Sequence, residues 1–230
     1  MQMIWQSLLS LAAAGCMMFS GPVAAAAPQH DADGLLFLAN RQWRMSKNYV
    51  PETRVTNVIG QVRELRPDAS LALEEMYAAC EAEIGVKLTS VSGYRSYGKQ
   101  SKIYQNKLER VNGSKKRADE YVARPGASEH QLALAMDVGQ KNETSLQESF
   151  GKTEGGAWVR DNCWRFGFIL RYQEGWEEIT GYSFEPWHVR YVGKENAAKI
   201  HQANMPLETY LEKTRGEMLL SIVTGEIIED

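Results

Sequence analysis

The fold of this chain is decided by the stretch Ser128-Glu129-His130-Gln131-Leu132-Ala133-Leu134-Ala135-Met136-Asp137. Its second half is apolar enough to be a buried strand over residues 133–138, in which Asp137 is the polar exception. A carboxylate in a buried strand requires a cation or several hydrogen-bond donors to offset the loss of its hydration. His130 lies seven residues before Asp137, so the stretch predicts a strand that carries a polar site.

A second histidine of interest lies far downstream, in Glu185-Pro186-Trp187-His188. The imidazoles of His130 and His188 and the carboxylate of Asp137 are the kinds of ligand that suit a zinc ion. Three protein ligands leave the fourth tetrahedral position for water, which is typical of a catalytic zinc. Glu185 would then accept a proton from that water. The alternative is a structural network of buried polar side chains.

Length and composition indicate one ordinary globular domain. The chain has 230 residues, of which 43% are hydrophobic and 24% charged. Its net charge of -3 shows no excess of basic residues that could bind phosphates, so no nucleic-acid partner is expected. Helical and strand patterns alternate without a βαβ rhythm. They predict an α+β fold: a single domain with a small antiparallel sheet flanked by helices and the zinc site at the sheet.

The N-terminal segment differs from the rest of the chain. Residues 1–27 contain no Lys, Arg, Asp or Glu and are largely apolar. Ala24 and Ala26 fit the small-residue pattern before a signal-peptidase cleavage site. We therefore predict a signal peptide over residues 1–26 and an exported protein of the periplasm or cell envelope. An uncleaved anchor or lipidation at Cys16 is the alternative, and only these would attach the protein to a membrane.

Two cysteines remain after the predicted cleavage. Cys80 and Cys163 are an even pair, which is compatible with a disulfide in an oxidising compartment. Two buried free thiols are the alternative. The distance and orientation of the two cysteines decide whether a disulfide can form. Neither cysteine has the close second cysteine expected of a zinc ribbon.

Hydrophobic periodicity and turn residues predict the order of the elements. We expect helices over residues 67–84, 97–111, 118–123, 156–165, 197–202 and 207–213. We expect strands over residues 86–92, 133–138, 168–172 and 182–192, the last two joined as a hairpin. Residues 34–212 are assigned to the catalytic domain and residues 213–230 to a C-terminal tail.

Three motifs follow one another in the chain: Ser92-Gly93-Tyr94-Arg95-Ser96, then Ser128-Glu129-His130-x6-Asp137, and then Glu185-Pro186-Trp187-His188-Val189-Arg190-Tyr191-Val192-Gly193. Together they resemble the VanY-type D-alanyl-D-alanine carboxypeptidases, which belong with L,D-carboxypeptidases to the LAS superfamily of zinc peptidases. The stretches 49–52, 166–172 and 180–182 are also similar to that family. The resemblance extends from about Leu35 to Leu211.

The resemblance implies Zn²⁺ as cofactor on His130, Asp137 and His188, with Glu185 as the general base. Arg95 follows a predicted strand. We predict that it is the fixed cation that stabilises an oxyanion or holds a terminal carboxylate, with an ordinary ion pair as the alternative.

Four more residues are expected to bind substrate. Gln100 and Ser128 match substrate-binding positions of the family. Tyr94 and Trp187 are expected to line the cleft, where packing and substrate contact remain equally open. Ala133 is a departure, because the family usually has glycine there. If the position requires a positive φ, the alanine is strained.

The implied function is that of an exported zinc carboxypeptidase that removes the terminal D-alanine of peptidoglycan stem peptides by zinc-activated water. Two alternatives remain open. One is an L,D-carboxypeptidase acting on tetrapeptide stems. The other is a catalytically inactive cell-wall binding protein, against which the intact Glu185 and ligand set argue.

Overall fold

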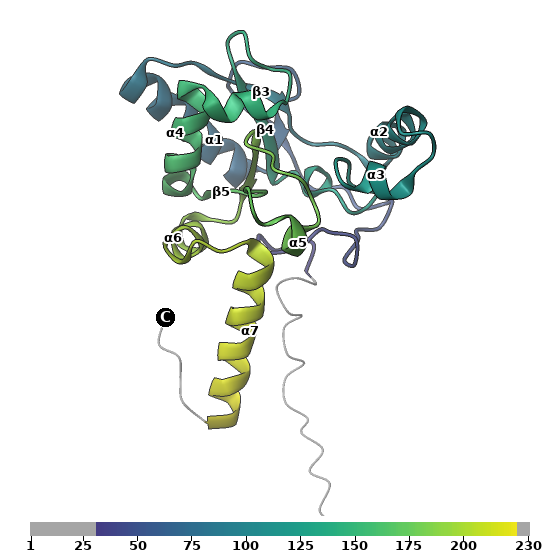
Figure 1. Ribbon diagram of the computed structural model, residues 1–230. Coiled ribbons are helices and arrows are strands. Elements are labelled where there is room, and N and C mark those ends of the chain that lie inside the picture. The colour runs from purple at the N-terminus through teal and green to yellow at the C-terminus, as the bar shows by residue number, and fades with distance from the viewer. Residues whose placement is uncertain (1–30, 225–230) are drawn as a thin grey trace, which may run out of the picture.

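The computed structural model describes residues 31–224 (Figure 1). The predicted signal peptide over residues 1–26 and residues 225–230 of the predicted tail lie outside the described part. Between residues 31 and 224, no helix has both the length and the apolar character that crossing a bilayer requires.

A four-stranded antiparallel sheet forms the centre of the domain. Its strands lie in the order β3 (Leu88–Ser92), β4 (Ala135–Gln140), β6 (His188–Tyr191) and β5 (Phe168–Leu170). A second, two-stranded sheet pairs β1 (Arg54–Val55) with β2 (Glu64–Leu65). All of these strand pairs are antiparallel, and the predicted α+β class with a small antiparallel sheet is confirmed.

Helices surround the central sheet. The α-helices are α1 (Pro67–Ile84), α2 (Tyr97–Arg110), α3 (Lys115–Asp119), α4 (Glu154–Asn162), α5 (Glu177–Thr180), α6 (Lys194–Ala203) and α7 (Leu207–Thr224). The 3₁₀ helices are η2 (Glu129–Leu132), η3 (Glu148–Lys152) and η4 (Cys163–Phe166). Helices α1 and α4 lie on one side of the sheet, and α2 and α3 lie on the other (Figure 1).

Helix α1 has the limits that the sequence predicts. Pro67 occupies the first turn, where its missing N–H costs no hydrogen bond. Gly85 ends the helix in the left-handed conformation with φ 72°, and its N–H donates to the carbonyl of Glu81. The buried face of α1 packs into the main core, which also includes side chains of β3, β4, α4 and η4.

The structure differs from the predicted elements around the last strands. The strand predicted over residues 182–192 pairs only at β6, because Pro186 has no N–H to donate. Helix α5 lies inside the connection that we predicted as a simple hairpin, although β5 and β6 do pair.

The predicted C-terminal boundary at residue 213 falls inside helix α7, which continues to Thr224. Residues 213–224 contain no proline to interrupt the hydrogen bonds of the helix. In Figure 1 α7 extends away from the body of the domain. Its first turns pack in a second core with β5 and α6 through Leu207, Tyr210 and Leu211.

Cys80 and Cys163 are both free and buried, so the structure has two buried free thiols and not a disulfide between them. Burial raises the pKa of Cys163 to about 12 and that of Cys80 to about 11. Thiols in such surroundings have little thiolate and act as apolar core residues.

Candidate active site

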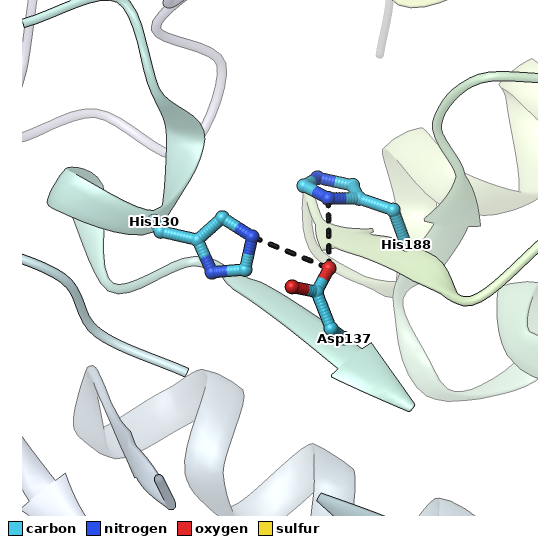
Figure 2. Close-up of side chains that lie close together, drawn as sticks. All are labelled: His130, Asp137 and His188. Atoms are coloured by element: carbon cyan, nitrogen blue, oxygen red, sulfur yellow. Dashed lines mark ion pairs between the residues drawn. The ribbon is translucent and has the colours of Figure 1, made fainter. Parts of the chain in front are cut away.

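The pairing of β4 with β6 creates the centre of the site. The register places Asp137 directly opposite His188. Directly opposite residues of an antiparallel pair project from the same face of the sheet, so their side chains meet. His130 reaches the same point from η2, just before β4 begins (Figure 2).

The three side chains converge on one carboxylate oxygen. Asp137 Oδ1 lies 3.3 Å from His130 Nε2 and 3.2 Å from His188 Nδ1. One ligand atom from each of the three residues lies within 4.8 Å of the others, and all three residues are buried. The structure thus brings together the three residues that we predicted as metal ligands.

Each imidazole uses its other nitrogen to bind the scaffold. His130 Nδ1 lies 2.8 Å from the carbonyl oxygen of Gly93, and His188 Nε2 lies 3.2 Å from Oε2 of Glu129. Both partners are acceptors, so each of these nitrogens carries the proton. The remaining nitrogens then direct their lone pairs toward Asp137. In histidine metal ligands, the nitrogen that does not bind the metal usually donates its proton to a carbonyl or carboxylate in this way.

Close packing fixes the carbonyl that orients His130. A Cβ added at Gly93 would lie 2.6 Å from the carbonyl oxygen of Glu64, so only glycine fits there. The same segment donates from the backbone N–H of Arg95 to the carbonyl of His130. The Ser-Gly-Tyr-Arg motif therefore positions both a ligand and a cation.

Two atoms at this point are buried without a hydrogen bond: His130 Nε2 and Asp137 Oδ1. Buried polar atoms without partners are rare and call for an ion or water. A nitrogen lone pair beside an oxygen anion is a donor set that matches a divalent metal of the zinc type. The residues therefore fit the metal that the sequence predicts.

The protonation of the three residues follows from their surroundings. Burial, assisted by Arg95, lowers the pKa of His130 to about 4. Burial alone would raise the pKa of Asp137, but His130 and His188 hold it well below its usual range. Burial alone would lower the pKa of His188, but the neighbouring carboxylates of Asp137 and Glu129 raise it to about 9. A metal ion would replace that proton on His188, because metal ligands bind deprotonated.

Glu185 lies beside the three residues, with Oε2 3.7 Å from His188 Nδ1. Its side chain is 15% exposed, so it contacts the cleft while losing most of its hydration. Burial raises the pKa of Glu185 to about 7, although the nearby His188 opposes the shift. A carboxylate with a pKa near neutrality is suited to exchange protons with a substrate.

Arg95 provides the cation of the site. Its Nη2 lies 3.8 Å from Oδ2 of Asp137, and its side chain is 17% exposed. The Nε of Arg95 is buried without a partner, so part of the guanidinium is free to bind a carboxylate or an oxyanion.

Two hollows meet at the site. A large cleft of about 1130 Å³ runs between α2 and the segments 146–149 and 183–188, and Trp187 is in its wall. A small pocket of about 60 Å³, which we call the inner pocket, adjoins it and includes Arg95, Gln100 and Ser128 in its lining. Glu185 and His188 border both hollows.

Tyr94 lines neither of these hollows. Contact of Tyr94 with substrate therefore stays a prediction, and packing stays the alternative.

Sequence reasoning missed two parts of the site. The first is Tyr182, whose hydroxyl is buried without a partner in the wall of the inner pocket. The second is Glu129, which lies next to the ligand His130 in the chain but contacts the other ligand, His188. A carboxylate directly before the predicted ligand His130 was the available signal for Glu129.

Ala133 has φ 55° and ψ 31°, the left-handed conformation, and is fully buried. It ends η2 and begins the turn into β4, so the unusual dihedrals connect His130 to the strand of Asp137. The strain expected for an alanine at a glycine position is therefore present.

Comparison with known proteins agrees with this geometry. The family model described as VanY, D-alanyl-D-alanine carboxypeptidase, matches residues 62–194, more than half of the chain. The chain belongs to the VanY family.

Two curated proteins are similar to most of the chain. The Bacillus subtilis (strain 168) protein YodJ is 42% identical over 191 residues, which cover 80% of this chain and 69% of YodJ. The D-alanyl-D-alanine carboxypeptidase of Enterococcus faecium is 39% identical over 139 residues, which cover 60% of this chain and 41% of that protein.

Solved structures of VanY-family proteins share the fold. The LdcB LD-carboxypeptidase has a TM-score of 0.75 at 42% identity, covering 79% of this chain and 87% of that chain. A variant of the vancomycin resistance D,D-pentapeptidase VanY in complex with Zn(II) has a TM-score of 0.66 at 37% identity, covering 76% of this chain and 98% of that chain. The chain is thus a metallocarboxypeptidase by family, and it resembles members of both specificities.

Proposed function

We propose that this protein is a zinc carboxypeptidase that releases the terminal D-alanine of peptidoglycan stem peptides. The observation that carries the proposal is the pair of buried, unpartnered ligand atoms on His130 and Asp137. Asp137 lines the large cleft, His130 lines the inner pocket, and Glu185 lines both. His130 Nε2, Asp137 Oδ1 and His188 Nδ1 are the atoms that would hold Zn²⁺.

Bound zinc would supply a Lewis acid that polarises the scissile carbonyl and lowers the pKa of a water molecule. Glu185 accepts the proton of the attacking water and returns it to the leaving amine. Its place in the wall shared by both hollows supports this role, because the scissile bond must lie where the cleft meets the inner pocket.

The inner pocket binds the residue that is released. Arg95 Nε, Gln100 Oε1 and the Tyr182 hydroxyl are buried polar atoms without partners around this pocket. Arg95 and the tyrosine hydroxyl donate to the terminal carboxylate, and the small volume admits a methyl side chain more readily than a long one. Ser128 also lines this pocket.

The large cleft binds the rest of the stem peptide, with Trp187 in its wall. We assign D,D-carboxypeptidase activity first, as in the VanY structures. The likeness to the LdcB LD-carboxypeptidase supports L,D-carboxypeptidase activity as the second candidate. Both activities require the same capture of a terminal carboxylate and the same attack by water.

We further propose that the protein is exported and matures by cleavage after Ala26, on the evidence of the leader composition. Intact-mass measurement of the protein recovered from its native envelope fraction tests this. A mass that includes residues 1–26 without lipid would contradict cleavage.

The activity is tested by incubating zinc-loaded protein with pentapeptide and tetrapeptide stems and identifying the products by mass spectrometry. We expect loss of one D-alanine from the pentapeptide, and none with the control variant Glu185→Gln. Release from the tetrapeptide alone would select the L,D activity. Release from neither stem by zinc-loaded protein would contradict the proposed function.

A further inference from the structure

The scaffold behind His188 is a chain of buried charged side chains. His188 Nε2 lies 3.2 Å from Oε2 of Glu129, whose other oxygen, Oε1, accepts from two arginines. Arg171 Nε and Arg190 Nη1 each lie 2.8 Å from that oxygen. The side chains of Glu129, Arg171 and Arg190 are at most 1% exposed.

The chain of contacts continues to helix α7. Arg171 Nη1 and Nη2 donate to the two carboxylate oxygens of Glu208, at 2.9 Å and 2.6 Å. This two-point pair is the strongest geometry for an arginine and a carboxylate. Glu208 lies in the first turn of α7, where the positive end of the helix dipole favours an acid.

The four charged side chains balance one another. Glu129 and Glu208 supply two negative charges, and Arg171 and Arg190 supply two positive charges. Arg190 also donates to the carbonyls of Leu35 and Phe37. Without Glu208, both guanidiniums would face the single carboxylate of Glu129. That carboxylate would then interact more with the arginines and less with the N–H of His188.

We propose that Glu208 is a positioning residue for the ligand His188, acting through Arg171 and Glu129, and that α7 thereby supports the metal site. The inference rests on the proposed function, because it assumes that His188 binds zinc. Partners that orient a ligand imidazole and raise its basicity commonly determine metal affinity.

The test compares Glu208→Gln with Glu212→Gln, an exposed acid one turn further along α7. Zinc affinity is measured by competition with a chelator of known affinity, and the Co²⁺-substituted proteins are compared by visible absorption. We expect Glu208→Gln to weaken zinc binding about tenfold, the lower end of the range for outer partners of a ligand. We also expect it to alter the cobalt spectrum, and expect Glu212→Gln to change neither.

A second readout separates positioning from general stability. A purely structural tie would lower the unfolding temperature of the metal-free and zinc-loaded proteins equally, whereas positioning reduces the increase caused by zinc. In a Glu129→Gln background, the effect of Glu208→Gln on zinc affinity should be much smaller, because the link is already broken. Should Glu208→Gln not fold, Glu208→Asp keeps the charge at a shorter reach and is expected to weaken zinc binding less.

Two results would overturn the inference. If Glu208→Gln has the zinc affinity and cobalt spectrum of the wild type, then the ion pair of Glu208 with Arg171 only stabilises the structure. The proposed function would be unaffected by that result. A wild-type protein that binds no zinc would overturn the proposed function and this inference together.

Discussion

Two clusters of charged side chains lie back to back in the centre of this domain, and they are built in opposite ways. On the cleft side, His130, Asp137 and Arg95 each keep a buried polar atom without a hydrogen bond. On the far side, none of the buried polar atoms of Glu129, Arg171 and Arg190 lacks a partner. His188 joins the two clusters, with Nδ1 toward one and Nε2 toward the other.

The difference indicates that the two clusters have different roles. A fully paired network is rigid and chemically inert, since every donor and acceptor is used. Unpartnered atoms are costly for stability, and they persist where a metal or a substrate completes them. The fully paired network is thus suited to hold the predicted ligands in place, and the unpartnered atoms of the cleft side are suited to the proposed chemistry.

The largest expected effect comes from Glu185→Gln, which leaves the ligands intact but removes the proton acceptor. We expect turnover of stem peptides to fall about 100- to 10,000-fold, the usual contribution of general acid–base catalysis. Zinc content measured by atomic absorption should stay stoichiometric. The matched control, Glu177→Gln in α5, should keep wild-type turnover. Undiminished hydrolysis by Glu185→Gln would remove that residue from the mechanism.

Arg171→Met breaks the paired network instead. It leaves Glu129 and Glu208 with fewer partners, and breaking a buried ion pair on one side typically costs about 3–5 kcal/mol. Chemical denaturation should therefore show a large loss in the free energy of unfolding. Arg160→Met removes an exposed pair with Asp161 and should change it by less than about 1 kcal/mol. Equal losses in the two variants would contradict the contrast between the networks.

On the cleft side, the buried carboxyl group of Glu185 should make the stability of the metal-free protein depend on pH. The pKa of Glu185 is raised from 4.5 to about 7, so its contribution to stability is present below pH 4.5 and is lost as the pH rises through 7. At pH 8, Glu185→Gln should therefore be more stable than the wild type by about 3 kcal/mol, and at pH 4 the advantage should vanish. Denaturation curves at the two pH values measure this, and a constant difference between them would refute the assignment.

The smallest expected effect is at the turn that connects the clusters. Ala133→Gly removes a left-handed alanine, which costs about 1–2 kcal/mol, but it also loses a buried methyl group worth about 0.8 kcal/mol. The free energy of unfolding should rise by less than about 1 kcal/mol. Ala135→Gly, in the adjacent strand, should lower it. A substantial loss in Ala133→Gly would indicate that the methyl group matters more than the backbone strain.

Much of the fold follows from local patterns. Pro67 and Gly85 determine the limits of α1 through backbone chemistry that needs no distant partner. The family glycine at position 133 pointed to either a close backbone approach or unusual dihedrals, and the structure has the latter. The α+β class and the antiparallel sheet also follow from the order of the elements. The end of α7 was not predicted, because the boundary placed at residue 213 had no stop signal of its own.

The sequence by itself determined which chemistry is available: two histidines, an aspartate in an apolar strand, and a glutamate three residues before the second histidine. Their types and motifs predict a metal site, because imidazole and carboxylate groups suit a divalent cation such as zinc. Only the tertiary structure decided how they meet, since the β4–β6 register sets Asp137 opposite His188. It also decided that Glu129 orients His188 and is linked to α7 through Arg171 and Glu208. Such contacts depend on packing between residues far apart in the chain, and no local pattern encodes them.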